Sequence, residues 1–163
     1  MSAQNAINSD ENVTRILSNG WVVDGALQHT AFILREGETY ISVNRPAVVS
    51  YASDVISFVK THKNFITTQG DAISYQRANL NVGNIRNIAI IVEGQPLAID
   101  VEVEPRNVFT KSHAGIFTRY DNKNVKMGST LAVSQEKDIS ADLVLLKVRL
   151  ALVRLSSLET CYI

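Results

Sequence analysis

Apolar and acidic side chains alternate without interruption from residue 99 to residue 104, and this alternation constrains the fold more than any other feature of the chain. Successive side chains of a β-strand point to opposite faces, so the segment predicts a strand with one dry face and one wet face. A dry face needs a covering layer, which predicts a sheet backed by other elements. The apolar positions are Ile99, Val101 and Val103, and the acidic positions are Asp100, Glu102 and Glu104.

Other apolar runs bounded by turn residues predict further strands, and a Glu-Gly turn predicts a hairpin between the second and third of them. The polar, aperiodic segment Asn64–Ala78 predicts a loop, and Asn122–Ser129 predicts a turn region. The predicted strands are Trp21–Val23, Thr30–Arg35, Thr39–Asn44, Ile88–Val92, Leu97–Glu104 and His113–Tyr120.

Helical spacing predicts one amphipathic helix at residues 50–62, where Tyr51, Val55, Phe58 and Val59 form an apolar stripe. Shorter helices are expected from Ser9 or Asp10 to Gly20 and at the segment "NVGNIRN".

The Leu-rich segment 140–158 has Asp138 or Ser140 as a candidate cap, and its length and leucine content favour a helix. A strand remains the alternative, because Leu146, Val148, Leu150 and Leu152 also occupy every second position.

These elements predict a single α+β domain over residues 1–163, with residues 1–9 frayed. We expect a mainly antiparallel sheet of five to seven strands, with the two main helices, near residues 50–62 and 140–158, packed on one face.

Charge and targeting signals exclude several classes of protein. Sixteen basic and sixteen acidic side chains cancel, so no overall field steers the molecule toward nucleic acid or anionic lipid. The N-terminal residues lack the pattern of a secretory signal, and the longest apolar stretch is too short and too charged to span a membrane. The single Cys161 fits a reducing compartment, so we expect a cytoplasmic protein.

Three segments occur in a fixed order: "AFILREGETYISVNR", "NVGNIRNIAI" and "HAGI", the last followed by the Leu-rich C-terminal segment. In that order they resemble small uncharacterised bacterial proteins that carry F-x-L-R … L-S-V-N, V-G-x-I-R and H-A-x-I segments. The resemblance implies a soluble bacterial protein and supplies no catalytic residue.

His29 and His113 each begin a predicted strand and are the candidate catalytic residues, as a general acid and base for a phosphodiester. Two-histidine phosphoesterases carry a hydroxyl residue two positions after each histidine, whereas this chain has Ala31 and Gly115 there. His62, at the end of a predicted helix, is expected to contact the last carbonyls. His113 is interpreted first as a polar strand-end residue.

The stretch from residue 106 to residue 126 interleaves basic and aromatic side chains, a pattern that suits contact with a polyanion. The alternative is a wet strand face whose cations pair with the carboxylates of residues 100–104. The candidate ligand-binding residues are Arg106, Lys111, Arg119 and Lys123, together with Arg45.

No metal or cofactor is expected. Three scattered histidines and one tail cysteine do not make a closed zinc site, and no Gly-rich phosphate loop or G-x-S-x-G elbow occurs. Asp100, Glu102 and Glu104 could bind a hard cation only if other loops contributed oxygens, and a solvated strand face is the alternative.

We therefore expect a non-enzymatic interaction or regulatory module that binds a protein or a polyanion. The alternative is an enzyme acting on a nucleotide or RNA phosphate, with His113 as acid or base. Apolar side chains between Leu143 and Leu158 cover nearly the whole helical circumference, which predicts a homodimer through this segment.

Overall fold

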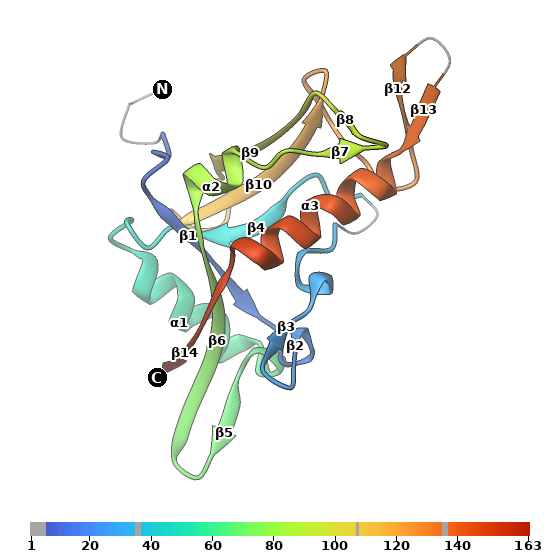
Figure 1. The fold of residues 1–163 in the computed structure, drawn as a ribbon. Helices are drawn as coiled ribbons and strands as arrows, with labels where there is room; N and C mark the ends of the chain where they lie inside the picture. Colours follow the sequence, from blue (N-terminus) through green and yellow to red (C-terminus); the bar gives the residue numbers. More distant parts are fainter. Residues whose placement is uncertain (1–5, 35–36, 107, 135–136) are drawn as a thin grey trace.

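The computed structural model describes residues 6–34, 37–106, 108–134 and 137–163. Within them the chain has an α+β fold built on one antiparallel sheet of eight strands (Figure 1). The fold class and the antiparallel sheet are confirmed, and the sheet has one strand more than the upper limit predicted. Its strands are β1 (Asn12–Leu17), β4 (Ile41–Asn44), β5 (Thr67–Gln69), β6 (Ala72–Asn81), β9 (Ile99–Pro105), β10 (His113–Tyr120), β11 (Lys123–Asn124) and β14 (Ser157–Tyr162).

The strand order is β11-β10-β4-β1-β6-β14. Strand β9 pairs with the edge of β10 that is opposite β4 and β11, and β5 pairs with the start of β6. Short hairpins extend from this sheet. They are β2 (Val22–Val23) with β3 (Ala26–Leu27), β7 (Ile91–Val92) with β8 (Gln95–Pro96), and β12 (Thr130–Ser134) with β13 (Lys137–Ser140).

The alternation of apolar and acidic side chains at residues 99–104 is confirmed in β9. Val101 and Val103 are buried, whereas Asp100 lies on the exposed face. The predicted strand at His113–Tyr120 is β10, with the same bounds, and Thr39–Asn44 contains the shorter β4.

The helices are α1 (Tyr51–Thr61), α2 (Val82–Arg86) and α3 (Ala141–Leu155). They confirm the amphipathic helix, the single turn at "NVGNIRN" and the helical interpretation of the Leu-rich segment. The segment does not stay helical to residue 158, because the chain turns at Ser156 and continues as β14.

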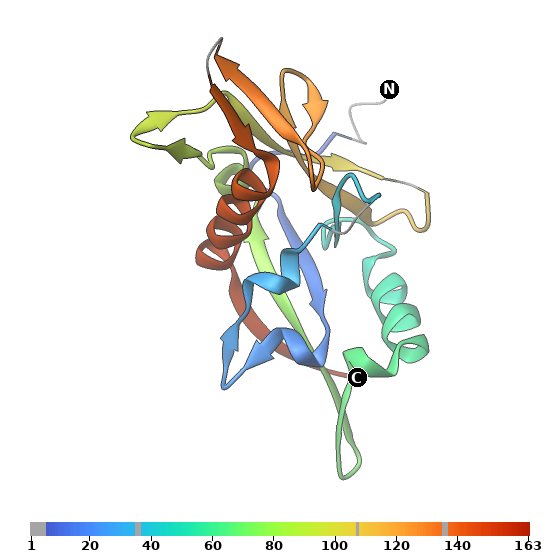
Figure 2. The same cartoon turned by 90° about the vertical axis from the view of Figure 1, so that its right-hand side faces the viewer.

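The two main helices lie on opposite faces of the sheet, so the prediction that they share one face is wrong (Figure 2). Side-chain alternation along β1 explains this. Val13 and Leu17 point into the large core beneath α3, whereas Ile16 points the other way and packs against Val55 and Val59 of α1. Each helix therefore buries its own face of the sheet.

Three other predictions are wrong. The expected helix from Ser9 or Asp10 to Gly20 is mostly strand β1, because this segment buries side chains on both of its faces inside the sheet. The first residues of the expected strand Thr30–Arg35 belong instead to the 3-10 helix His29–Phe32, which buries Phe32, and Arg35 lies outside the described residues. The expected loop Asn64–Ala78 contains β5 and most of β6, a strand held between β1 and β14.

The N-terminal segment is partly packed. Residues 1–5 of the expected frayed stretch lie outside the described residues, but Ile7 is buried in the core beneath α3. In the described part of the chain, no helix has the length and apolar character needed to cross a membrane.

Candidate functional site

A pocket of about 540 Å³ lies on the α1 side of the sheet. Its wall combines side chains from β1, β4, α1, the segments on either side of these elements, and the start of β10. Apolar surface predominates in it. The lining residues are Arg15, Ile16, Trp21, Ser42, Asn44, Asp54, Phe58, His62, Phe65, Phe109, Thr110 and His113.

The pocket exists because β1 and β4 separate early. Only Thr14 and Asn44 are register partners between these two strands. Beyond that pair the side chain of Arg15 bridges the gap: Nε donates to the Ala31 carbonyl at 2.7 Å and Nη1 donates to the Ser42 carbonyl at 2.6 Å. The charged side chain of Arg15 therefore spans the gap between the two strands and lines the pocket there.

Three aromatic rings form one side of the pocket. The ring of Phe65 meets the rings of Trp21 and Phe58 edge to face, with centroids 5.9 and 5.0 Å away. The Arg15 guanidinium lies 4.9 Å from the centre of the Trp21 ring, and His62 stacks on Phe58. Such edge-to-face contacts fix the rings relative to one another, so this wall is preformed.

His62 ends α1 as expected. Its Nδ1 lies 2.8 Å from the Phe58 carbonyl, which accepts one of the last hydrogen bonds of the helix.

Asp54 ties α1 to the start of β10. Its Oδ2 accepts hydrogen bonds from the Ser112 hydroxyl at 2.7 Å, the Ser50 hydroxyl at 2.9 Å and the Ser112 amide at 3.3 Å. Burial alone would raise the pKa of Asp54, but these hydrogen bonds hold it below its ordinary value. The carboxylate is thus ionised and already occupied by donors of its own chain.

His113 begins β10, which confirms it as a strand-end residue, and its ring faces the pocket. Burial lowers the pKa of His113, and the positive charge of Arg106 lowers it further, so the ring is neutral at pH 7. Its Nε2 lies 3.2 Å from the Tyr40 hydroxyl, and Phe109 meets it edge to face.

His29 lies on the other side of the sheet. It begins the 3-10 helix His29–Phe32 rather than a strand, and its Nδ1 is 3.4 Å from Nε of Arg149 in α3. His29 is not among the residues that line the pocket with His113, so the structure does not bring the two candidate catalytic histidines together.

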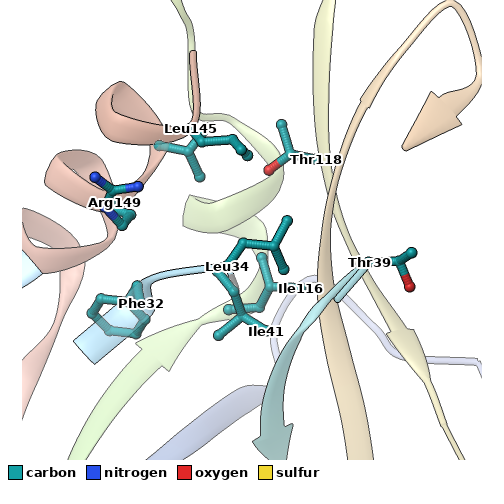
Figure 3. A pocket seen from close by; sticks show the side chains of 9 residues that line it. Phe32, Leu34, Thr39, Ile41, Ile116, Thr118, Leu145 and Arg149 are labelled. Atoms are coloured by element: carbon teal, nitrogen blue, oxygen red, sulfur yellow. The ribbon is translucent and has the colours of Figure 1, made fainter. Parts of the chain in front are cut away.

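Next to Arg149, a second hollow lies in the core between α3 and the sheet (Figure 3). Phe32, Leu34, Ile116 and Leu145 close it, and its volume is about 10 Å³. A space of this size holds one water molecule at most, so it is a packing defect and no ligand site.

None of the five predicted ligand-binding residues lines the pocket, and two of them are held by carboxylates. Arg45 pairs with Glu11 at 3.1 Å, both side chains being largely buried. Arg119 binds Glu104 through two nitrogens, and these hydrogen bonds keep the pKa of Glu104 below its ordinary value despite burial. For Arg119 the ion-pair alternative is therefore confirmed.

The other three predicted cations lie at the surface or against a ring. Lys111 and Lys123 are exposed. The Arg106 guanidinium lies 5.0 Å from the centre of the Tyr40 ring, and its Nε has no hydrogen-bond partner among the described residues.

Most of the pocket residues carry no signal in the sequence that marks them as a site. Phe58 was assigned to the buried stripe of its helix, but the structure leaves 36% of it exposed at the pocket. Trp21 and Phe65 carry no local signal, because their contact depends on a loop that joins distant elements.

Among the described residues, no group of three or more histidine, cysteine, aspartate or glutamate side chains could hold a metal ion. No protein-family model, curated protein or solved structure matches the chain.

Proposed function

We propose that the protein is a non-enzymatic binding module whose pocket receives an apolar, ring-bearing group. The aromatic wall of Trp21, Phe58 and Phe65 carries this proposal, with Phe109 across the opening. A volume of about 540 Å³ lies within the range of small-ligand and side-chain pockets. An incoming ring would find edge and face partners of the kind that aromatic groups prefer.

The polar groups of the pocket support an uncharged ligand group. Arg15 donates to two backbone carbonyls, and Asp54 accepts from Ser50 and Ser112. Because these charges are satisfied within the chain, a charged ligand would have to displace bonds that already exist.

A protein is the partner that best fits the surroundings of the pocket. Val108 is 60% exposed and Phe109 is 78% exposed beside the opening. Exposed apolar residues next to an aromatic pocket are typical of surfaces that bury an anchor side chain of another protein.

The proposal is tested with Trp21, the one tryptophan of the chain, as the reporter. The uncharged fluorophore N-phenyl-1-naphthylamine, bound in the pocket, should accept excitation energy from Trp21. Ser42→Phe, at an exposed position of β4 in the pocket wall, should fill the pocket and weaken probe binding by about tenfold, or 1.4 kcal/mol.

Ser134→Phe makes the same substitution at an exposed position of β12, outside the pocket, and should leave probe binding unchanged. Absence of energy transfer in the parent protein, or equal probe affinity for Ser42→Phe and the parent, would contradict the proposal.

The enzyme alternative rests on His113 alone. A neutral imidazole beside Tyr40 and Arg106 is a reasonable general base for a phosphodiester of a nucleotide or RNA. Its test is a panel of nucleotides: His113→Ala should abolish any hydrolysis that the parent shows. A parent without hydrolysis, or a variant that keeps it, would exclude this role.

We also propose that the module works in the cytoplasm, which the single Cys161 supports. Polyanion binding would fall to Lys111 and Lys123, the exposed members of the predicted basic set. The homodimer through Leu143 to Leu158 remains a proposal, and the partial exposure of Leu143, Leu150 and Leu158 supports it.

A further inference from the structure

The two long edge strands of the sheet are protected very differently. β9 carries Asp100, Glu102 and Glu104, and Arg86 of α2 donates to the Val103 carbonyl of this strand at 3.2 Å. β14 carries one charged residue, Glu159, and among the described residues it pairs with no strand except β6. An uncovered edge strand without blocking charges is a template for pairing with another chain.

The free edge of β14 presents the backbone groups of alternate residues. Ile163 donates its amide to the Ile73 carbonyl, so Ile163 and the residues two and four positions before it direct their backbone groups toward β6. The residues between them, Leu158, Thr160 and Tyr162, therefore direct their amides and carbonyls outward.

The two faces of β14 differ in the same alternation. Glu159 accepts from Arg77, which also donates to Tyr51 of α1, so the odd-numbered side chains face α1. Leu158 and Tyr162 point to the opposite face, where 39% of the leucine and 75% of the tyrosine are exposed. An apolar strip thus accompanies the free edge.

We propose that β14 pairs antiparallel with β14 of a second copy about a two-fold axis at Thr160, which joins the two sheets into one. In this arrangement Leu158 lies opposite Tyr162 of the second copy, and Thr160 lies opposite Thr160 of the second copy. The outward amides and carbonyls of one strand can therefore bond to those of the other. The two exposed apolar residues cover each other in cross-strand pairs.

Axes at residues 159, 160 and 161 would all pair outward backbone groups with outward backbone groups. The side chains that then lie opposite each other favour the axis at Thr160. An axis at Thr160 places Glu159 opposite Cys161 of the second copy. An axis one residue earlier would set Glu159 against Glu159, which is unfavourable for like charges directly opposite. An axis one residue later would set Tyr162 opposite Thr160 and separate it from Leu158, so the two exposed apolar side chains would no longer cover each other.

The proposal is independent of the pocket, and its test combines sedimentation with directed disulfides. The parent should sediment at twice 18.0 kDa. Glu159→Cys should form a covalent dimer on mild oxidation, because its thiol faces the native Cys161 of the second copy, in a pair close enough for a disulfide. The double variant Glu159→Cys/Cys161→Ser should lose this bond.

Ser157→Cys is the matched control, since it faces Ile163 of the second copy and should stay uncrosslinked. A parent that sediments as an 18.0 kDa monomer at micromolar concentration overturns the proposal. So does a covalent dimer that persists in the double variant, which would place Glu159 on the axis, or one that forms through Cys161 alone in the parent.

Discussion

The two faces of the sheet are held together in different ways. Beneath α3 a continuous apolar core includes Phe32, Leu80 and Leu152, all fully buried. Beneath α1 the buried cluster is limited to Ile16, Val55 and Val59, and much of the remaining space is the aromatic pocket. A face that buries its side chains completely has little left to offer a ligand, so we assign stability to the α3 face and binding to the α1 face.

Polar contacts take the place of the missing core on the α1 face. The Tyr51 hydroxyl is 2.9 Å from the Thr14 hydroxyl and accepts from Arg77 at 2.7 Å. Asp54 holds Ser112 as described above. These bonds fix where α1 sits on the sheet.

The largest expected effect contrasts one phenylalanine from each face. Phe32→Ala should lower the free energy of unfolding by about 3–5 kcal/mol, because it removes a fully buried ring from the core. Phe58→Ala should lower it by only about 0.5–1.5 kcal/mol, because this partly exposed ring loses its contacts with Phe65 and His62 but leaves no buried cavity. Urea denaturation measures both, and equal losses would mean that the faces do not differ as we argue.

A smaller effect is expected from the polar anchor of the α1 face. Asp54→Asn keeps the shape of the side chain but weakens its hydrogen bonds from Ser50 and Ser112. Because this residue is partly exposed, the free energy of unfolding should fall by only about 1 kcal/mol.

Asp54→Asn should weaken probe binding by a larger free energy than it lowers stability, since Ser112 adjoins His113 in the pocket wall. Asp142→Asn in α3 is the matched control: this carboxylate accepts from the Gly128 amide, far from the pocket wall. If Asp54→Asn and Asp142→Asn weaken probe binding equally, Asp54 does not shape the pocket.

The same contrast explains which elements the sequence could predict. β9 and α1 carry their own periodicity and β10 contains an apolar run, so the bounds of all three were predicted to within two residues. β6 was missed because its polar side chains are satisfied by a distant strand: Asn79 donates to Glu159, 80 residues later. Nothing local to residues 64–78 encodes that partner.

The pocket could not be predicted for a related reason. Its wall brings together residues from Arg15 to His113, and their common feature is the separation of β1 from β4. His113 was recognised from its position before an apolar run, but its partner Tyr40 belongs to the segment before β4. Arg45 was taken as a ligand contact because its partner Glu11 lies 34 residues away in the sequence, whereas the pairing of Arg119 with Glu104 was among the alternatives that the sequence offered.

The smallest expected effect concerns acid, and it again separates the two faces. Burial and the charge of Arg106 lower the pKa of His113 in the folded protein below its value in the unfolded chain. Between these two values the unfolded chain binds more protons, so the free energy of unfolding should fall as the pH drops below about 6.5. Above that pH the histidine is neutral in both states and contributes no pH dependence.

His113→Gln should therefore be less sensitive to acid than the parent between pH 7 and pH 5, in urea denaturation followed by the fluorescence of Trp21. Ser134→Gln at an exposed position of β12 is the control, because it introduces the same side chain outside the pocket, and this variant should keep the acid sensitivity of the parent. Parallel pH profiles for His113→Gln and the parent would show that protonation of His113 does not oppose folding. The α1 face would then lose its acid-sensitive element, although the aromatic pocket itself would remain.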